Sequence, residues 1–218
     1  MPRPWEILVV GGHVALDFVN TVGGLRDKDP DHEALESYED LLVWSRRVGS
    51  LSAPQVRALR AAAAGDPSGS ERALAQALSR RALIYDIFRP LADGKRPAPT
   101  LLERLRDFEL EALQHARLAP DEQGLRWTWP RAPGSLEAPL WPLTHAAIDL
   151  LTEGPLERLK VCANCRWLFL DESRNRSRRW CSMEECGTAV KKERFTERRR
   201  ERHKQREEDT NADHAQQH

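Results

Sequence analysis

The chain has 218 residues, and its 34 Lys and Arg residues balance 34 Asp and Glu residues. Its hydrophobic content of 40% is enough for a packed core. No apolar run approaches the ~20 residues that a membrane-spanning helix needs. We therefore expect one medium domain and one small domain, with no membrane partner.

The charge is segregated along the chain. Residues 1–159 contain 19 Lys/Arg and 23 Asp/Glu, a net charge of −4. Residues 160–206 contain 15 and 7, a net charge of +8, and residues 207–218 contain no basic and 4 acidic residues. A basic region confined to one part of a chain indicates a polyanion partner, although a solvated charged helix would have a similar composition.

The first concentrated polar signature is the segment Gly11–Thr21. On a helix, His13, Asp17 and Asn20 share one face, and Thr21 follows directly. One interpretation is a small-molecule site formed by His13, Asp17, Asn20 and Thr21, whose occupancy controls the rest of the protein. The other, which we favour, is that these polar residues satisfy neighbouring backbone groups inside the fold.

The rest of the first 157 residues is predicted to be mainly helical with a small β-hairpin. Apolar spacing and stop signals predict helices over Leu35–Val48, Ala53–Ala64, Ala73–Leu91, Leu101–Leu118 and Thr144–Thr152. The alternating segment Leu125–Trp129 is predicted to be a strand, with its partner near Leu136–Trp141.

All four cysteines lie close together in the sequence, as Cys162, Cys165, Cys181 and Cys186. Two close pairs joined by a loop of this length can place four thiolates around one tetrahedral Zn²⁺. Disulfides would need an oxidising compartment, and the first residues show no export signal. We therefore expect a cytoplasmic protein with one structural zinc ion.

The residues around the second pair predict the start of a helix. Ser182 and Glu185 form a capping-box pattern, so the helix should begin at Met183 and carry Cys186 in its first turns. The result is a treble-clef-like zinc finger over residues 158–206, whose folding depends on metal. Four Cys ligands leave no coordination position for water, and no hydrolase motif or phosphate-binding glycine loop is found, so we do not expect an enzyme.

The cysteine region resembles the CGNR zinc-finger family. The likeness rests on Cys162-Ala-Asn-Cys165-Arg-Trp-Leu-Phe-Leu, on Ser173-Arg-Asn-Arg-Ser-Arg-Arg-Trp-Cys181-Ser-Met, and on Cys186-Gly187 followed by a basic helix. The segment Gly11–Thr21 resembles the opening of the ABATE domain that precedes this finger in those proteins. The resemblance implies a stress-induced bacterial transcription regulator with an ABATE-like sensing domain over residues 1–157. Thr188 and Ala189 replace the Asn and Arg of the name-giving motif, so any contact of that Arg does not carry over.

The helix after Cys186 is predicted to have two differently charged faces. At ~100° per residue, one arc collects Lys191, Lys192, Arg194, Arg198, Arg199, Arg202 and Arg206, and the opposite arc collects Glu193, Glu197, Glu201 and Glu208. Only Arg200 and Lys204 break the acidic side. A merely solvated helix would mix its signs, so this pattern favours one face against phosphates.

Four arginines in the loop between the cysteine pairs, Arg174, Arg176, Arg178 and Arg179, are expected to add phosphate contacts. Our leading hypothesis is a DNA-binding transcription regulator whose first domain senses a small-molecule effector or a partner. The alternative is an adaptor whose basic helix docks an acidic protein. RNA is a third candidate partner. It is less favoured than DNA because the finger lacks the several exposed aromatic residues on which bases would stack. The polar tail of residues 207–218 is predicted to be disordered.

Overall fold

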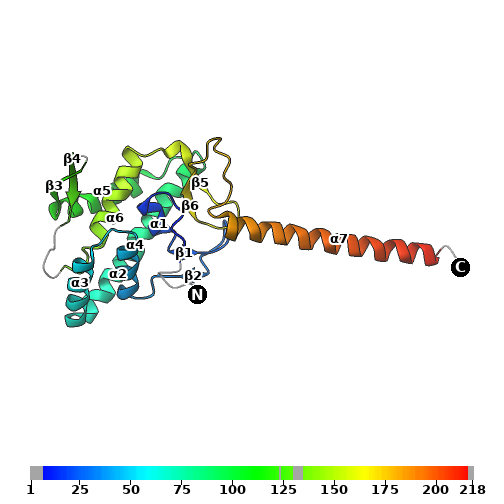
Figure 1. The fold of residues 1–218 in the computed structure, drawn as a ribbon, viewed down its shortest axis with the longest axis horizontal. Helices are drawn as coiled ribbons and strands as arrows, with labels where there is room; N and C mark the ends of the chain where they lie inside the picture. The colour runs from blue at the N-terminus through cyan, green and yellow to red at the C-terminus, as the bar shows by residue number, and fades with distance from the viewer. Residues whose placement is uncertain (1–6, 123, 130–134, 216–218) are drawn as a thin grey trace. The chain divides into compact units, whose positions relative to one another are not determined.

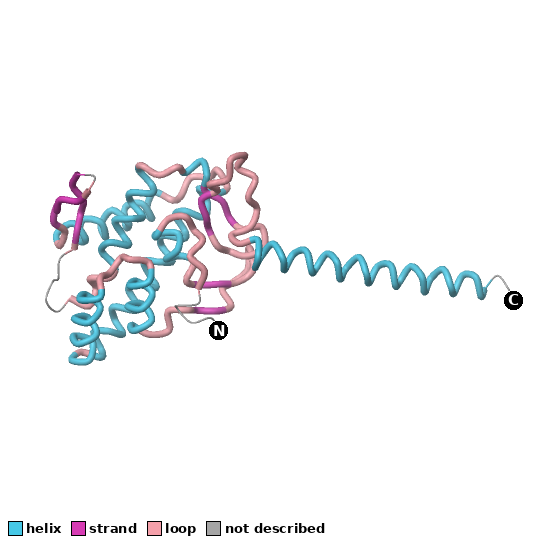
Figure 2. Tube along the Cα trace, viewed as in Figure 1, coloured by secondary structure: helices cyan, strands magenta, loops and turns pink. Residues whose placement is uncertain are grey.

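The computed structural model describes residues 7–122, 124–129 and 135–215, and it is mainly α-helical (Figures 1 and 2). It divides into two compact units, Met1–Cys181 and Ser182–His218. The helices of the first unit are α1 (Val14–Val19), α2 (Tyr38–Arg47), α3 (Ala53–Gly65), α4 (Pro67–Ala92), α5 (Pro99–Gln114) and α6 (Leu140–Thr152), with a 3₁₀ turn over Leu156–Arg158. The second unit contains a π-helical turn, Met183–Gly187, and α7, Thr188–Ala215.

The strands form small antiparallel pairs. Among the described residues these are β1 (Val22–Gly23) with β2 (His32–Glu33), β3 (Arg117–Asp121) with β4 (Gly124–Thr128), and β5 (Leu159–Val161) with β6 (Leu168–Leu170). The mainly α fold with a small hairpin is thus confirmed.

Most helix ends follow local capping chemistry. Ser37 and Ser52 each accept a hydrogen bond from a backbone N–H in the first turn of α2 and α3, and each forms a reciprocal capping box. Helix α4 begins earlier than predicted because the Asp66 side chain accepts from the N–H of Gly69 at 2.8 Å. Pro67 occupies its first turn, a position that suits proline.

One strand partner was predicted wrongly. The segment Leu125–Trp129 does contribute β4, but its partner is β3, whereas Leu140 and Trp141 begin α6. A hairpin between adjacent segments closes a much shorter loop. Its turn ends at Gly124, whose φ of +138° is readily adopted by glycine.

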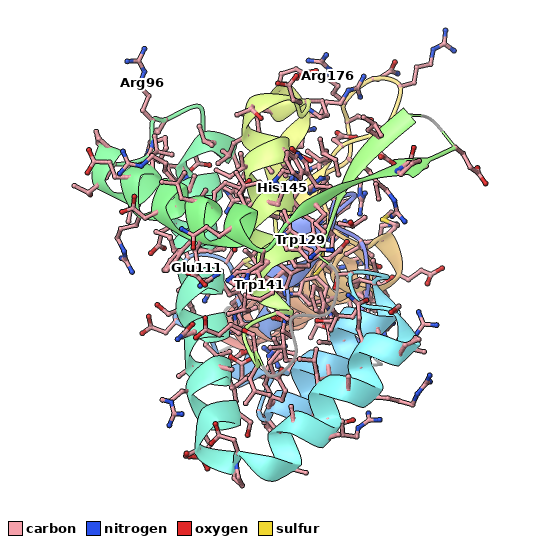
Figure 3. The ribbon with its side chains drawn as sticks, turned by 90° about the vertical axis from the view of Figure 1, so that its left-hand side faces the viewer. Arg96, Glu111, Trp129, Trp141, His145 and Arg176 are labelled. Carbon is pink, nitrogen blue, oxygen red and sulfur yellow. The ribbon has the colours of Figure 1, made fainter. Side chains whose placement is uncertain are left out.

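The hairpin β3–β4 leads into the packing between α5 and α6. Trp129, just after β4, donates its Nε1–H to the carbonyl of Ala112 at 2.9 Å. Figure 3 shows Trp129 next to His145, and their ring centroids are 5.2 Å apart. His145 in turn shares a hydrogen bond with the buried carboxylate of Glu109 at 2.6 Å between Nδ1 and Oε1. These contacts place a polar, aromatic cluster beneath the hairpin.

The short helix α1 lies in the middle of the core of the first unit. Five of its six residues are buried, and it packs against α4, α6 and β6. Strands β5 and β6 belong to the same core, because Leu159, Val161, Leu168 and Leu170 are all buried in the cluster that contains Leu16 and Phe18. The compact units therefore divide after Cys181, within the predicted finger, while the predicted limits at residues 157 and 206 stay predictions.

Helix α7 is described as far as Ala215. The predicted disorder of residues 207–218 stays a prediction. No proline or glycine follows Gly187, so nothing in the sequence of this stretch breaks a helix once it has started. Residues 216–218 lie outside the described part of the chain.

Candidate metal centre and nucleic-acid interface

The metal centre begins at the turn between β5 and β6. The register pairs Leu159 with Leu170 and Val161 with Leu168, so the buried residues of both strands face the core together. The N–H of Cys162 donates to the carbonyl of Trp167 at 2.9 Å and closes the turn. Cys162 and Cys165 therefore both lie in the turn that connects β5 to β6.

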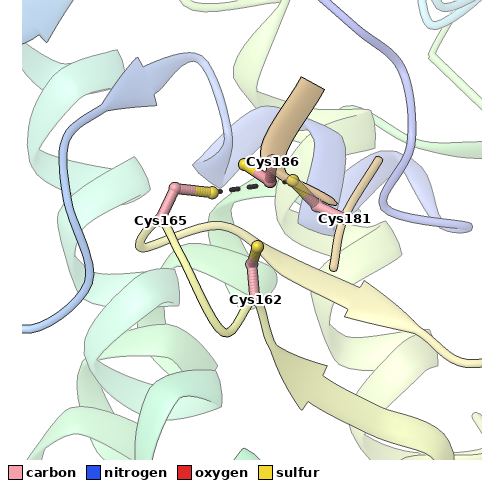
Figure 4. A group of neighbouring side chains, drawn as sticks. All are labelled: Cys162, Cys165, Cys181 and Cys186. Atoms are coloured by element: carbon pink, nitrogen blue, oxygen red, sulfur yellow. Dashed lines mark hydrogen bonds between the residues drawn. The ribbon is translucent and has the colours of Figure 1, made fainter. Parts of the chain in front are cut away.

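The four cysteines converge on one point (Figure 4). Their Sγ atoms all lie within 4.8 Å of one another. The Sγ atoms of Cys165 and Cys181 are 3.5 Å apart, far beyond the ~2.05 Å of a disulfide bond. Four thiolates at Zn–S distances of about 2.3 Å form the closed tetrahedral shell of a structural zinc ion. Donor type and spacing thus fit one structural Zn²⁺, as the sequence predicts.

The backbone supports this set of ligands. The N–H of Asn164 points at the Sγ of Cys162 at 3.5 Å, the kind of contact that stabilises a thiolate. Cys162 and Cys181 are buried, whereas Cys165 and Cys186 are partly exposed. Each cysteine pair thus contributes one buried and one partly exposed thiol to the site.

The second unit begins with the predicted cap. The Oγ of Ser182 accepts from the N–H of Glu185 at 3.2 Å, and the helical turn begins at Met183, as expected. The turn is π-helical, and the hydroxyl of Thr188 donates to the carbonyl of Met183 at 3.1 Å. Thr188, which stands in place of the family's Asn, therefore completes the turn that carries Cys186.

Within the first unit, residues near the start of the chain contact the β5–β6 hairpin through backbone and side-chain hydrogen bonds. The indole of Trp167 donates to the carbonyl of Val22 at 3.0 Å, and the N–H of Leu170 donates to the carbonyl of Gly11 at 2.8 Å. The guanidinium of Arg26 donates to the carbonyl of Cys162 at 3.0 Å. Gly11 belongs to the segment predicted as a ligand site, whereas Val22 and Arg26 follow that segment in the chain.

The four residues predicted to bind a ligand all form hydrogen bonds inside the fold. His13 caps α1, and its Nδ1 accepts from the N–H of Ala15 at 3.3 Å. Asn20 is the C-cap residue, and its amide pairs with the backbone of Leu168. The Thr21 hydroxyl donates to Phe18 and accepts from the buried Arg81. These contacts support the structural interpretation, and a ligand-binding role stays a prediction.

Asp17 shows the tight packing of this segment. Burial raises the pKa of Asp17, although the N–H groups of Gly11 and Val10 oppose the shift. Its Oδ1 accepts from the N–H of Gly11 at 2.8 Å. A Cβ at position 11 would lie 2.9 Å from the Cβ of Leu16, so only glycine allows this approach.

A buried carboxylate that the sequence analysis missed organises the loop between the cysteine pairs. Asp171 is fully buried and accepts from the ammonium of Lys160 at 2.6 Å, the hydroxyl of Ser173 at 2.6 Å and the N–H of Arg178 at 2.9 Å. Burial alone would raise the pKa of Asp171, but the hydrogen bonds from Lys160 and Ser173 and the charge of Lys160 outweigh it and hold the pKa well below its usual range. The only sequence signal for this role is an Asp directly after an apolar strand.

The loop arginines do not form a uniform set. Arg178 is partly buried, lies over the ring of Phe169 at 4.4 Å from its centroid, and donates to the carbonyls of Trp180 and Cys181. Its first role is therefore to hold the loop. Arg174, Arg176 and Arg179 are exposed, and Arg176 lies 3.4 Å from Glu157.

Helix α7 carries the other predicted residues on an exposed surface. Residues 191–202 are all exposed, which includes Lys191, Lys192, Arg194, Arg198, Arg199 and Arg202. The Nε atoms of Arg198 and Arg202 donate to the carbonyls of Arg194 and Arg198, one turn earlier, so these side chains follow one line along the helix. Within the described side chains, no ion pair involves residues 188–202. Side chains from residue 203 on, including Arg206 and Glu208, lie outside the described part.

Fold and site together define a helical domain joined to a four-cysteine zinc finger that continues into a basic helix. Comparison with known families agrees. The ABATE family, described as "Putative stress-induced transcription regulator", matches residues 12–154, and the CGNR zinc finger matches residues 158–199. The chain belongs to the ABATE family and carries a CGNR zinc finger. These families are regulatory and metal-binding in type rather than enzymatic. No curated protein matches the chain, and none of the described helices is long and apolar enough to cross a membrane.

Proposed function

We propose that this protein is a DNA-binding transcription regulator that contacts phosphates with the basic face of α7. The observation that carries the proposal is the separation of charge on an exposed helix. Arg194, Arg198 and Arg202 follow one another at i, i+4 spacing, as do Glu193, Glu197 and Glu201.

Such columns are unfavourable for an isolated helix. Like charges at i, i+4 repel by about as much as opposite charges attract, about 0.2–0.5 kcal/mol per pair. The described side chains of α7 offer no compensating ion pairs. A polyanion laid along the arginine column would remove the repulsion on that side, and it would release condensed counterions as well.

Zinc has a structural part in this function. With the four thiolates around it, the metal closes the turn from which α7 starts, and it supplies no open coordination position for catalysis. Arg174 and Arg179, both exposed in the loop between the cysteine pairs, add positive charge that is not committed to a carboxylate among the described residues.

Control of the finger by the first domain is part of the proposal. Its basis is the set of hydrogen bonds in which the carbonyls of Gly11 and Val22 accept from the β5–β6 hairpin and the amide of Asn20 donates to it. A small-molecule effector or a partner that changes the packing of α1 would act on the hairpin that bears Cys162 and Cys165.

A salt titration tests the proposed function. Binding of the zinc-loaded protein to duplex DNA, to single-stranded RNA and to an acidic polypeptide is measured by fluorescence anisotropy over a range of salt concentrations. We expect tightest binding to duplex DNA, with a log–log slope that reports about 0.9 per phosphate contacted. Binding only to the acidic polypeptide would contradict the proposed DNA binding and support an adaptor role. Tightest binding to RNA would indicate an RNA-binding protein instead.

A further inference from the structure

An open cavity of about 260 Å³ lies beside the turn that carries the first cysteine pair, wholly within the first unit. Four of its lining side chains are cationic and one is anionic. They are Arg26, Lys160, Arg178 and Arg179, and Asp93. The remaining lining residues, among them Ala163 of the cysteine turn, are small or apolar.

Three of the four cations are fixed in place. Arg26 donates to the carbonyls of Val161 and Cys162, at 3.4 and 3.0 Å. Lys160 is held by Asp171, and Arg178 by Phe169 and by backbone carbonyls. An incoming anion would therefore meet charges that are already ordered, and it would lose little side-chain entropy to collect them.

The positive charge of the cavity is not fully compensated. Asp93 forms an ion pair with Arg89 and lies 4.0 Å from Arg26, and Asp171 compensates Lys160. Neither Arg178 nor Arg179 has a carboxylate partner among the described residues. Two guanidinium charges of the cavity are thus not neutralised by any carboxylate that the structure describes.

Hydrogen-bond donors also remain. Within the described residues, the Nη1 of Arg178 and the whole guanidinium of Arg179 make no hydrogen bond. The backbone of Arg179 is nevertheless anchored, because its carbonyl accepts from the N–H of Ala163 at 2.8 Å. Planar guanidinium groups with open N–H pairs match the oxygens of a phosphate group.

We propose that this cavity binds a phosphate group. Its volume is slightly below the range of about 300–1,000 Å³ for sites that enclose drug-sized ligands, which suits a phosphate monoester rather than a larger anion. The phosphate could belong to a free phosphorylated small molecule or to the backbone of DNA. The site does not require that α7 binds DNA, so it goes beyond the proposed function.

The first experiment uses inorganic phosphate as the probe. The zinc-loaded full chain is titrated with sodium phosphate by calorimetry, and thermal unfolding is followed in phosphate and in chloride at equal ionic strength. We expect phosphate to bind and to raise the melting temperature above the chloride value, because a ligand of the folded state stabilises it by mass action. Zinc content is measured after each titration, since loss of metal would lower stability for a different reason.

Two arginine substitutions make the test specific. Arg179→Ala removes an exposed guanidinium that has no hydrogen bond within the described fold. We expect the variant to bind phosphate at least about tenfold more weakly, because a charge-assisted hydrogen bond is lost. Arg96→Ala removes an exposed guanidinium that does not line the cavity, and the variant should bind phosphate like the wild type. Equal binding by both variants, or no difference between phosphate and chloride in the wild type, would overturn the proposal.

A competition experiment distinguishes the two sources of the phosphate. If phosphate weakens binding to duplex DNA more than chloride does at the same ionic strength, the site holds a backbone phosphate. If phosphate binds without displacing DNA, the site belongs to a free phosphorylated ligand. If the protein binds no DNA at all, the proposed function fails while the phosphate titration still decides this site.

Discussion

The side-chain amide of Asn20 pairs with both backbone polar groups of Leu168. Its Nδ2 donates to the carbonyl of Leu168 at 2.8 Å, and its Oδ1 accepts from the N–H of Leu168 at 2.9 Å. The Asn20 side chain therefore forms the pair of hydrogen bonds that a neighbouring strand would form with β6, at a sequence separation of 148 residues. Asparagine is suited to this position because its amide carries a donor and an acceptor in one plane.

The first prediction concerns this pair. Asn20→Ala leaves the N–H and C=O of Leu168 buried without partners, and each such group costs about 1–3 kcal/mol. We expect the free energy of unfolding to fall by about 2–4 kcal/mol, measured by denaturant titration of the zinc-loaded protein. Asn175→Ala, in an exposed part of the loop, is the control and should change stability by less than about 0.5 kcal/mol. Equal effects of both substitutions would mean that the Asn20 pair contributes nothing.

The sequence predicts local features of this protein better than distant ones. The helices, the cap at Ser182 and the zinc ligands depend on residues near one another in the chain, so spacing and capping chemistry are enough to find them. The pairing of Asn20 with Leu168 and the role of Asp171 depend on which segments meet in space. Hydrophobic periodicity does not predict which segments that are distant in the sequence contact one another in the fold.

The hairpin partner shows a related limit. Arg117–Asp121 has too little alternation of buried and exposed residues to be recognised as a strand, because most residues of both β3 and β4 are exposed. The loop arginines illustrate another limit. All four are the same residue type, so the sequence does not distinguish them. In the structure, contacts with Phe169 and Asp171 hold Arg178 in the fold, whereas Arg174 and Arg179 are exposed.

The second prediction concerns removal of zinc. We expect one zinc ion per chain in protein purified without chelator, and loss of that ion when Cys162 or Cys181 is replaced by Ser. Strands β5 and β6 should keep their protection against hydrogen exchange without metal, because Leu159, Val161, Leu168 and Leu170 remain in the core. The turn over residues 181–187, which has little apolar packing of its own, should lose protection. Unchanged exchange in this turn after chelation would contradict a structural role for the metal.

The third prediction is a pH dependence at His145. The hydrogen bond to Glu109 raises the pKa of His145, with burial opposing and the charges of Glu109 and Asp149 adding to the rise. Because the folded pKa exceeds the ordinary 6.5, the pair stabilises the fold fully below about pH 6.5 and loses that contribution as the pH rises through the folded pKa.

Comparison with Glu109→Gln isolates this pair. The substitution replaces a charge-assisted hydrogen bond with a neutral one, so at pH 6 the variant should be less stable by about 1 kcal/mol. The difference should shrink as the pH is raised toward 9, measured by denaturant unfolding at each pH. A difference that stays constant across this range would show that His145 does not change its charge there.

The fourth prediction tests the two faces of α7. Arg194→Glu, Arg198→Glu and Arg202→Glu together should abolish most DNA affinity and flatten its salt dependence, because each lost phosphate contact reduces the log–log slope by about 0.9. Glu193→Gln, Glu197→Gln and Glu201→Gln together change three charges on the opposite face. They should leave affinity unchanged or strengthen it slightly, since these carboxylates point away from the phosphates.

The arginine variant lowers the net charge of this exposed helix, and the glutamate variant raises it. A purely non-specific attraction would respond to each variant in proportion to the charge changed. Arginine reversal alters the charge by −6 in total and glutamate neutralisation by +3, so non-specific binding predicts a loss in the first variant and a gain half as large in the second. A face-specific interface predicts a much larger ratio, because only the arginine column touches DNA. Zinc content equal to that of the wild type shows that the finger is still folded in both variants. If the ratio stays near two, the contact surface lies elsewhere, and the exposed Arg174, Arg176 and Arg179 of the loop become the residues to replace next.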